Sequence, residues 1–153
     1  MKLIKIIIIF LFFHSFSYAD KNMKIGSIGK ESEVSRVIKV VMYDNYFEPS
    51  SFQIKTGETI KFKVENAGML VHEFNIANKM MHMMHQPEMR KMFENGILLP
   101  FSIDKEKMKK MAKIDKSMGH SHSNSVLLEP KQKGEIVWKF DNAVDIEVAC
   151  NVP

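Results

Sequence analysis

Apolar and polar side chains alternate with a period of two along several short segments of this chain. In residues 59–65, for example, Ile60, Phe62 and Val64 fall on one face and charged residues on the other. This alternation is typical of a β-strand with one buried face. Alternation and β-branched composition predict strands over residues 37–43, 52–55, 59–65, 69–76, 125–128, 135–140 and 144–148. Short strands at this spacing, separated by turn residues, predict an antiparallel sandwich or barrel.

The alternation stops at residue 77, and residues 78–124 have helical rather than strand character. Residues 78–93 are rich in Met and His and contain Pro87. A proline inside a helix clashes with the carbonyl four residues earlier, so two short helical pieces are predicted here, the second beginning near Pro87. Residues 104–117 predict a further helix with Asp104 as its N-cap. We therefore interpret residues 78–124 as a helical insertion into the sandwich.

The N-terminal residues have the organisation of an export signal. Lysines precede an unbroken apolar run over residues 6–13, and a small-x-small cleavage site ends at Ala19. The run is shorter than the roughly 20 residues of a membrane-spanning helix, so residues 1–19 are predicted to be cleaved, with an uncleaved anchor as the alternative. After cleavage no stable membrane insertion is expected. Residues 20–34 are polar and predict a flexible mature N-terminus ahead of a domain over residues 35–153.

Charge and cysteine content exclude several classes of protein. The whole chain has a net charge of +4, and without Lys2 and Lys5 of the export signal it carries 20 basic and 18 acidic side chains. This mild charge, without a Lys/Arg block interleaved with aromatic residues, argues against nucleic-acid binding. The single cysteine, Cys150, excludes an internal disulfide. In an exported protein it is therefore a free thiol, an intermolecular bridge or a metal ligand.

Cys150 and His72 are candidate metal ligands on predicted strands. Cys150 follows the last strand in the same parity as Ile146 and Val148, and His72 lies in the strand over residues 69–76. Taken alone, the histidine has the alternative of a structural or exposed side chain, and the cysteine that of a small buried hydrophobe. Together, imidazole and thiolate at one end of an exported sandwich suit copper, with zinc as the rival because it takes the same donors.

Three segments of the chain resemble the plastocyanin/azurin-type cupredoxins. They are residues 71–74 (VHEF), 134–140 (GEIVWKF) and 147–153 (EVACNVP), and the resemblance is greatest to the periplasmic, copper-resistance-associated group with a Met-rich insertion. It implies an all-β, cupredoxin-like Greek-key sandwich with a helical Met/His-rich insertion, located in the periplasm. It also implies a bound copper ion, a role in copper tolerance or electron transfer, and a periplasmic redox partner or copper-handling protein.

The resemblance assigns His72 and Cys150 to the first two ligand positions of the family's copper site. In the family the cysteine loop continues into Gly-His and then a Met, which supply the second histidine and the axial ligand, and a further strand follows. This chain ends at Pro153. The resemblance therefore implies a C-terminally truncated domain that lacks its last strand, with an incomplete primary metal site.

The insertion contains a second group of candidate copper ligands. The chain has 13 methionines against 7 glycines, an unusual ratio that favours a soft metal. Thioether and imidazole groups suit Cu(I), whereas the alternative is that the methionines pack the insertion against the sandwich. His120 and His122 either bind Cu(II) weakly or belong to a solvated loop. The candidate auxiliary ligands are Met80, Met81, His82, Met83, Met84, His85, His120 and His122.

Three functions are consistent with these features. The first is an exported copper-binding cupredoxin in copper tolerance or electron transfer. The second is a copper carrier or sequestering protein that acts through the Met/His insertion. The third is a β-sandwich interaction module without metal, or a non-functional truncated product. An enzyme is not expected, because neither a third orienting group nor an oxyanion element accompanies Cys150 and His72.

Overall fold

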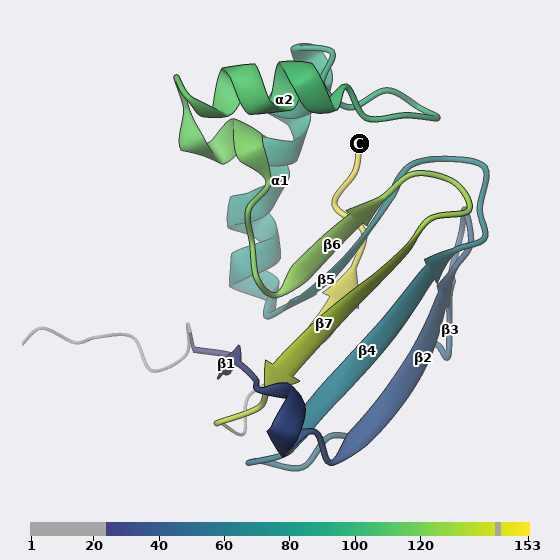
Figure 1. Cartoon of the computed structure of the whole chain (residues 1–153), viewed down its shortest axis with the longest axis vertical. Coiled ribbons are helices and arrows are strands. Elements are labelled where there is room, and N and C mark those ends of the chain that lie inside the picture. Colours follow the sequence, from purple (N-terminus) through teal and green to yellow (C-terminus); the bar gives the residue numbers. More distant parts are fainter. Residues whose placement is uncertain (1–23, 143–144) are drawn as a thin grey trace, which may run out of the picture.

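The computed structural model describes residues 24–142 and 145–153, which form two β-sheets and a helical region (Figure 1). The strands are β1 (Ser27–Ile28), β2 (Arg36–Met42), β3 (Phe47–Glu48), β4 (Thr59–Asn66), β5 (His72–Ala77), β6 (Ser125–Leu128), β7 (Lys133–Lys139) and β8 (Glu147–Ala149). One sheet has the strand order β1-β7-β4-β2-β3 and the other β6-β5-β8. The prediction of a β-sandwich is confirmed. The predicted export signal over residues 1–19 lies outside the described residues.

Most neighbouring strands run antiparallel, but β2 and β4 are parallel. Their register pairs Ile38 with Phe62 and Val40 with Val64. Parallel neighbours need a connection that returns the chain to the edge where the first strand began. Residues 43–58 make that connection, and they include β3, which pairs antiparallel with β2. The prediction of a purely antiparallel sandwich is therefore wrong for this pair.

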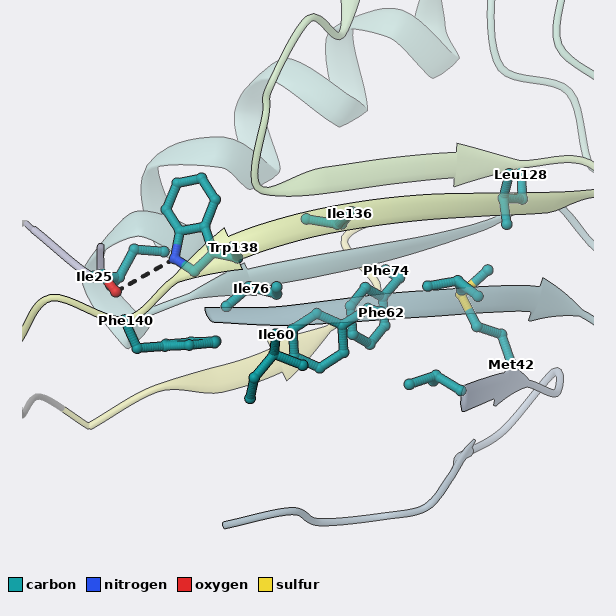
Figure 2. Close-up of a cluster of buried hydrophobic side chains, with 12 residues drawn as sticks. Ile25, Met42, Ile60, Phe62, Phe74, Ile76, Leu128, Ile136, Trp138 and Phe140 are labelled. Carbon is teal, nitrogen blue, oxygen red and sulfur yellow. Dashed lines mark hydrogen bonds between the residues drawn. The ribbon is translucent and has the colours of Figure 1, made fainter. Parts of the chain in front are cut away.

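Apolar side chains from both sheets fill the space between them (Figure 2). Phe62 of β4 packs against Phe52 and Phe74, and both ring centroids lie 5.4 Å from its own. The rings are tilted, which is an arrangement that aromatic pairs prefer. Ile60, Phe62 and Val64 are at most 1% exposed, as the alternation of this strand predicted.

Residues 52–55 form no strand, contrary to the prediction from their alternation. Phe52 and Ile54 are partly buried against the core, which accounts for the pattern. The backbone here bonds to a side chain instead of a neighbouring strand, because Arg36 donates a 2.7 Å hydrogen bond to the carbonyl of Gln53. The alternation in this segment therefore reflects the burial of Phe52 and Ile54 on one side, and it does not indicate pairing within a sheet.

Residues 24–34 belong to the segment expected to be flexible, yet they pack onto the sandwich. Ile25 is 2% exposed, and the indole N–H of Trp138 donates to its carbonyl at 3.4 Å (Figure 2). Gly26 follows with a φ of +139°, and a Cβ at this position would lie 2.1 Å from the carbonyl oxygen of Lys139, so only glycine fits. β1 then pairs with β7. Ile25 anchors this segment on the sandwich, although the composition of the segment is mostly polar.

The insertion between β5 and β6 contains α1 (Lys79–Glu94), α2 (Lys105–Ala112) and the short 3-10 helix η3 (Lys116–Gly119), which lie together at one end of the molecule (Figure 1). α1 is continuous, so the predicted break at Pro87 is wrong. The helix predicted over residues 104–117 is shorter than expected, and α2 begins directly after its predicted cap, Asp104, whose side chain accepts from the amide of Lys107. None of the helices that the structure describes has the length and apolar composition needed to cross a membrane.

Tertiary packing explains why α1 tolerates its proline. The side chain of Asn78 caps the helix by accepting from the amide of Met81 at 2.9 Å. One face of the helix is then buried through His82, His85, Met89 and Met92. Met89 and Met92 belong to a second apolar cluster, which also contains Val71, Ile97, Leu98, Ile103 and Met118. Burial of this face outweighs the hydrogen bond that Pro87 removes. For Met89, Met92 and Met118, packing is the role that the structure shows.

Candidate metal centre

His72 and Cys150 lie side by side at one end of the smaller sheet. β5 and β8 pair antiparallel with Asn75 opposite Ala149, which brings Cys150 next to the first residues of β5. Sγ of Cys150 lies 3.7 Å from Nδ1 of His72 and accepts a 3.3 Å hydrogen bond from the backbone N–H of Glu73. The structure therefore brings together the two residues that the sequence assigned to the primary metal site.

Asp44 holds the ring of His72. Its Oδ1 lies 2.9 Å from Nε2 of His72 and also accepts from the amides of Met69 at 2.8 Å and Leu70 at 3.1 Å. These hydrogen bonds, chiefly the one from His72, hold the pKa of Asp44 below its ordinary value. Because a carboxylate only accepts, Nε2 donates to Asp44, and in the neutral imidazole Nδ1 then has its lone pair free for a metal ion.

Gly68 leaves room for this contact. A Cβ at position 68 would lie 2.4 Å from Oδ1 of Asp44 and 2.9 Å from Nε2 of His72. Such distances are far inside van der Waals contact, so a side chain here would separate the carboxylate from the imidazole. Gly68 is thus a requirement of the site.

Cys150 is half-buried at the end of β8. Burial raises the pKa of this thiol above its ordinary value, so the sulfur is protonated in the absence of metal. A metal ion that binds here displaces the proton, since the thiolate is the ligand form. The pair lines a cavity of about 720 Å³, together with Tyr43, Tyr46 and Phe93.

The two donors fit a soft or borderline metal ion. Sulfur and nitrogen bonded to one tetrahedral zinc ion at about 2.3 and 2.0–2.1 Å would lie roughly 3.5 Å apart. The observed separation is 3.7 Å. Copper takes the same donors, so this distance suits both metals. Asp44 supplies the carboxylate partner that metal-bound histidines usually have on their second nitrogen.

We expect Asp44→Asn to weaken copper binding at this pair by about 10–100-fold, because a neutral amide no longer fixes the orientation and basicity of the imidazole. A competition titration against a chelator of known affinity measures the change. Asp145→Asn replaces an exposed aspartate and serves as the matched control. Equal affinities for the two variants would contradict the role assigned to Asp44.

On the opposite face of β5, Glu73 is 0% exposed at the centre of a polar cluster. Burial alone would raise the pKa of Glu73, but hydrogen bonds from His120 and His85 outweigh it and hold the pKa well below its ordinary value. The carboxylate is therefore ionised and saturated with donors. Those donors are His120 (2.7 Å), Asn151 (2.8 Å), His85 (2.9 Å), Ser125 (2.9 Å) and Asn75 (3.2 Å).

His85 has a carboxylate on each ring nitrogen. Nε2 lies 2.9 Å from Glu73 and Nδ1 lies 3.0 Å from Glu88. Burial lowers the pKa of His85, but the two glutamates outweigh burial and raise it above its ordinary value. The rings of His120 and His122 pack against His85, with centroid distances of 5.5 and 4.8 Å. A solvated loop is therefore wrong for His120, whose side chain is 5% exposed.

The other candidate ligands of the insertion lie on different faces of α1. Met80, Met83 and Met84 are 56%, 58% and 59% exposed. Met81 is partly buried against the core of the sandwich, and His82 is buried as well. The structure thus does not gather this run of residues into one site. It presents three thioethers at the surface and turns the remaining side chains inward.

Asp44, Glu73 and Glu88 were missed by the sequence analysis. Asp44 lies in a turn-rich connection, far from His72 in sequence, and no local pattern connects the two. Glu73 is the direct neighbour of His72, but alternation places it on the face away from the core, where solvent is the ordinary expectation. A charged residue inside a strand whose six residues are all buried is a signal that only the structure reveals.

The chain is similar to proteins of one family. The family model described as a cupredoxin-like domain matches residues 5–93. The chain is 39% identical over 134 residues to the copper-resistant cuproprotein CopI of Pseudomonas aeruginosa, covering 84% of this chain and 74% of that protein. It is 28% identical over 135 residues to the protein of the same name from Rubrivivax gelatinosus, covering 88% of this chain and 68% of that protein.

Two solved structures share the fold. Reduced auracyanin from Roseiflexus castenholzii aligns with a TM-score of 0.52 and 15% identity, over 78% of this chain and 87% of that one. Auracyanin B aligns with a TM-score of 0.55 and 10% identity, over 86% of this chain and 88% of that one. At these identities the likeness concerns the fold alone. The expected all-β, cupredoxin-like sandwich is confirmed.

Proposed function

This chain belongs to the cupredoxin-like family, and from that premise we propose that it is a periplasmic copper-binding protein that serves copper tolerance. The proposed primary ligands are His72 and Cys150. The observation that carries the proposal is the 3.7 Å separation of Sγ and Nδ1, with Asp44 on the other ring nitrogen. A half-buried thiol and an oriented imidazole at this distance are able to bind one metal ion.

Copper is proposed over zinc because of the relatives. Two of them carry the name copper-resistant cuproprotein. Thiolate and imidazole are also the donors of blue-copper sites. The apolar run near the N-terminus supports export, and in an exported protein a single cysteine calls for a ligand or partner.

Electron transfer belongs to the same proposal. Copper held by thiolate and imidazole exchanges one electron between Cu(I) and Cu(II). The N–H of Glu73 and the carboxylate of Asp44 hold both ligands on the protein framework, which limits the movement that a change of oxidation state requires. A periplasmic redox partner or copper-handling protein would exchange the electron or the ion. Substrate turnover is not part of the proposal.

A second candidate function is copper carriage by the insertion. The specific observation in its favour is the exposure of Met80, Met83 and Met84 on α1. A side chain with only a packing role would be buried, whereas exposed thioethers are soft ligands within reach of Cu(I). Their position on one helix suits brief binding and release.

Copper titration of the purified exported chain tests the proposal. The first equivalent of Cu(II) is expected to bind at His72 and Cys150 and to produce an intense visible absorption band, which excess Zn(II) does not remove. Under reducing conditions, Cu(I) bound beyond one equivalent and lost on replacing Met80, Met83 and Met84 with leucine would support the carrier function. Absence of copper binding in both oxidation states would overturn both functions and favour an interaction module without metal.

A further inference from the structure

We propose that Glu73, His85 and His120 form a second metal site, which takes a borderline divalent cation of the Zn²⁺ or Cu²⁺ class and is separate from His72 and Cys150. His85 and His120 were candidate ligands by sequence, but Glu73 was not. The site extends the proposed function and does not depend on it, because Glu73 is on the face of β5 opposite His72, and His85 and His120 come from the insertion that covers that face.

The three donor atoms lie close enough together to bind one ion. Oε1 of Glu73 lies 2.9 Å from Nε2 of His85 and 2.7 Å from Nε2 of His120. The ligand atoms of the three residues all lie within 4.8 Å of one another. Around a tetrahedral ion with bonds of about 2.0–2.1 Å, neighbouring ligand atoms lie roughly 3.3 Å apart. A small outward shift of each side chain therefore admits the ion in place of the shared protons.

The cluster also has the partners that support metal ligands. Glu88 lies 3.0 Å from Nδ1 of His85, so this histidine has a carboxylate on the nitrogen that faces away from the site. The carboxylate–histidine–metal arrangement fixes the tautomer of a ligand. Asp44 holds His72 in the same manner at the primary site. Oγ of Ser125, at 2.9 Å from Glu73 and 3.3 Å from His120, is placed to act as a fourth ligand or to bond with one.

Three different elements present these ligands. Glu73 is in the middle of the smaller sheet, His85 is on the buried face of α1, and His120 ends η3. His120 has φ of 45° and ψ of 50°, a left-handed conformation that is uncommon for residues other than glycine. Such strained positions cluster at functional sites, where the surrounding structure compensates for them. Together the ligands tie the insertion to the sandwich.

The chemistry of the donors selects the class of ion. Glu73, His85 and His120 supply one oxygen and two nitrogens without sulfur, and two histidines with a glutamate are a known zinc set. Cu(I) prefers thioether and thiolate ligands, which this cluster lacks. An alternative set of His85, Glu88 and His122 is less favourable, because the side chains of His122 and Glu88 are 39% and 35% exposed, whereas Glu73 is fully buried.

Zinc titration in a Cys150→Ser background tests the site, because the primary site is then disabled. Calorimetry is expected to show one equivalent of bound Zn²⁺, and Zn²⁺ is expected to raise the midpoint of thermal unfolding. Co²⁺ is expected to give the visible absorption bands of a four-coordinate ion. Adding His120→Gln is expected to weaken Zn²⁺ binding by about 100-fold or more and to abolish the thermal shift. His82→Gln is the matched control, a buried histidine on α1 that is none of the three ligands and lies 3.3 Å from the side-chain nitrogen of Asn151.

Circular dichroism of each variant without metal shows that it is folded, and His85→Gln replaces His120→Gln if the latter is not. Zn²⁺ affinity unchanged by both substitutions, or lost equally in His82→Gln, would overturn the proposal. Zn²⁺ affinity lost in His122→Gln but kept in His120→Gln would overturn it and favour the alternative set of His85, Glu88 and His122. If the folded Cys150→Ser protein binds no Zn²⁺, the proposal is overturned and the cluster is a buried network of ion pairs. Absence of a copper band in the unmodified protein has no bearing on these results.

Discussion

Cys150→Ser is expected to abolish the intense visible absorption of the copper-loaded protein. The band requires a thiolate bound to Cu(II), and a serine hydroxyl of similar size does not supply that charge transfer. His72→Gln is expected to weaken or remove the band as well, because Sγ and Nδ1 of the pair lie 3.7 Å apart, which is close enough for both to bind one ion. Visible spectra recorded with one equivalent of Cu(II) measure both effects.

A histidine outside the pair provides the control for these spectra. His122→Gln lies in the cluster on the other face of β5 and is expected to keep the full band. A band retained by Cys150→Ser would show that the copper chromophore does not involve this sulfur. A band lost equally in His122→Gln would show that the spectrum reports general disruption and not ligation.

Glu73→Ala is expected to reduce the free energy of unfolding of the metal-free protein by about 3–5 kcal/mol. The substitution leaves the N–H groups of His85, His120 and Asn151 without their acceptor in a buried site. Whole-domain stability is typically only about 5–15 kcal/mol, so the loss would be a large share of the total. Urea unfolding, followed by circular dichroism in the presence of a chelator, measures it.

Glu65→Ala is the matched control for this prediction. Glu65 pairs with Lys133 at 3.0 Å on the surface of the larger sheet, where both side chains are exposed. Exposed ion pairs contribute about 0–1 kcal/mol, so the free energy of unfolding of this variant is expected to be close to that of the unmodified protein. A similar small change for both glutamates would mean that the Glu73 network does not stabilise the fold.

Local pattern was sufficient for most of the fold. The alternation in residues 59–65 and 135–140 predicted β4 and β7, because each of these strands has one face on the core and the other away from it. The pattern failed where burial and pairing differ. Residues 52–55 bury their apolar side chains without a neighbouring strand, and α1 continues through Pro87 because its other side chains are anchored. The periodicity of a sequence shows which side chains are buried. It does not show which segments pair through backbone hydrogen bonds.

The sequence by itself determined the sandwich, the position of the insertion, and the pairing of His72 with Cys150 as candidate ligands, the last through resemblance to a family. Only the tertiary structure decided the roles of Asp44 and Glu73. Asp44 is 28 residues from His72, and Glu73 is 47 from His120. Glu73 is buried because the insertion covers the second face of β5, and no property of a single strand specifies what packs against it. Contacts between distant segments depend on how whole elements stack, which is why the second cluster became visible only in the folded chain.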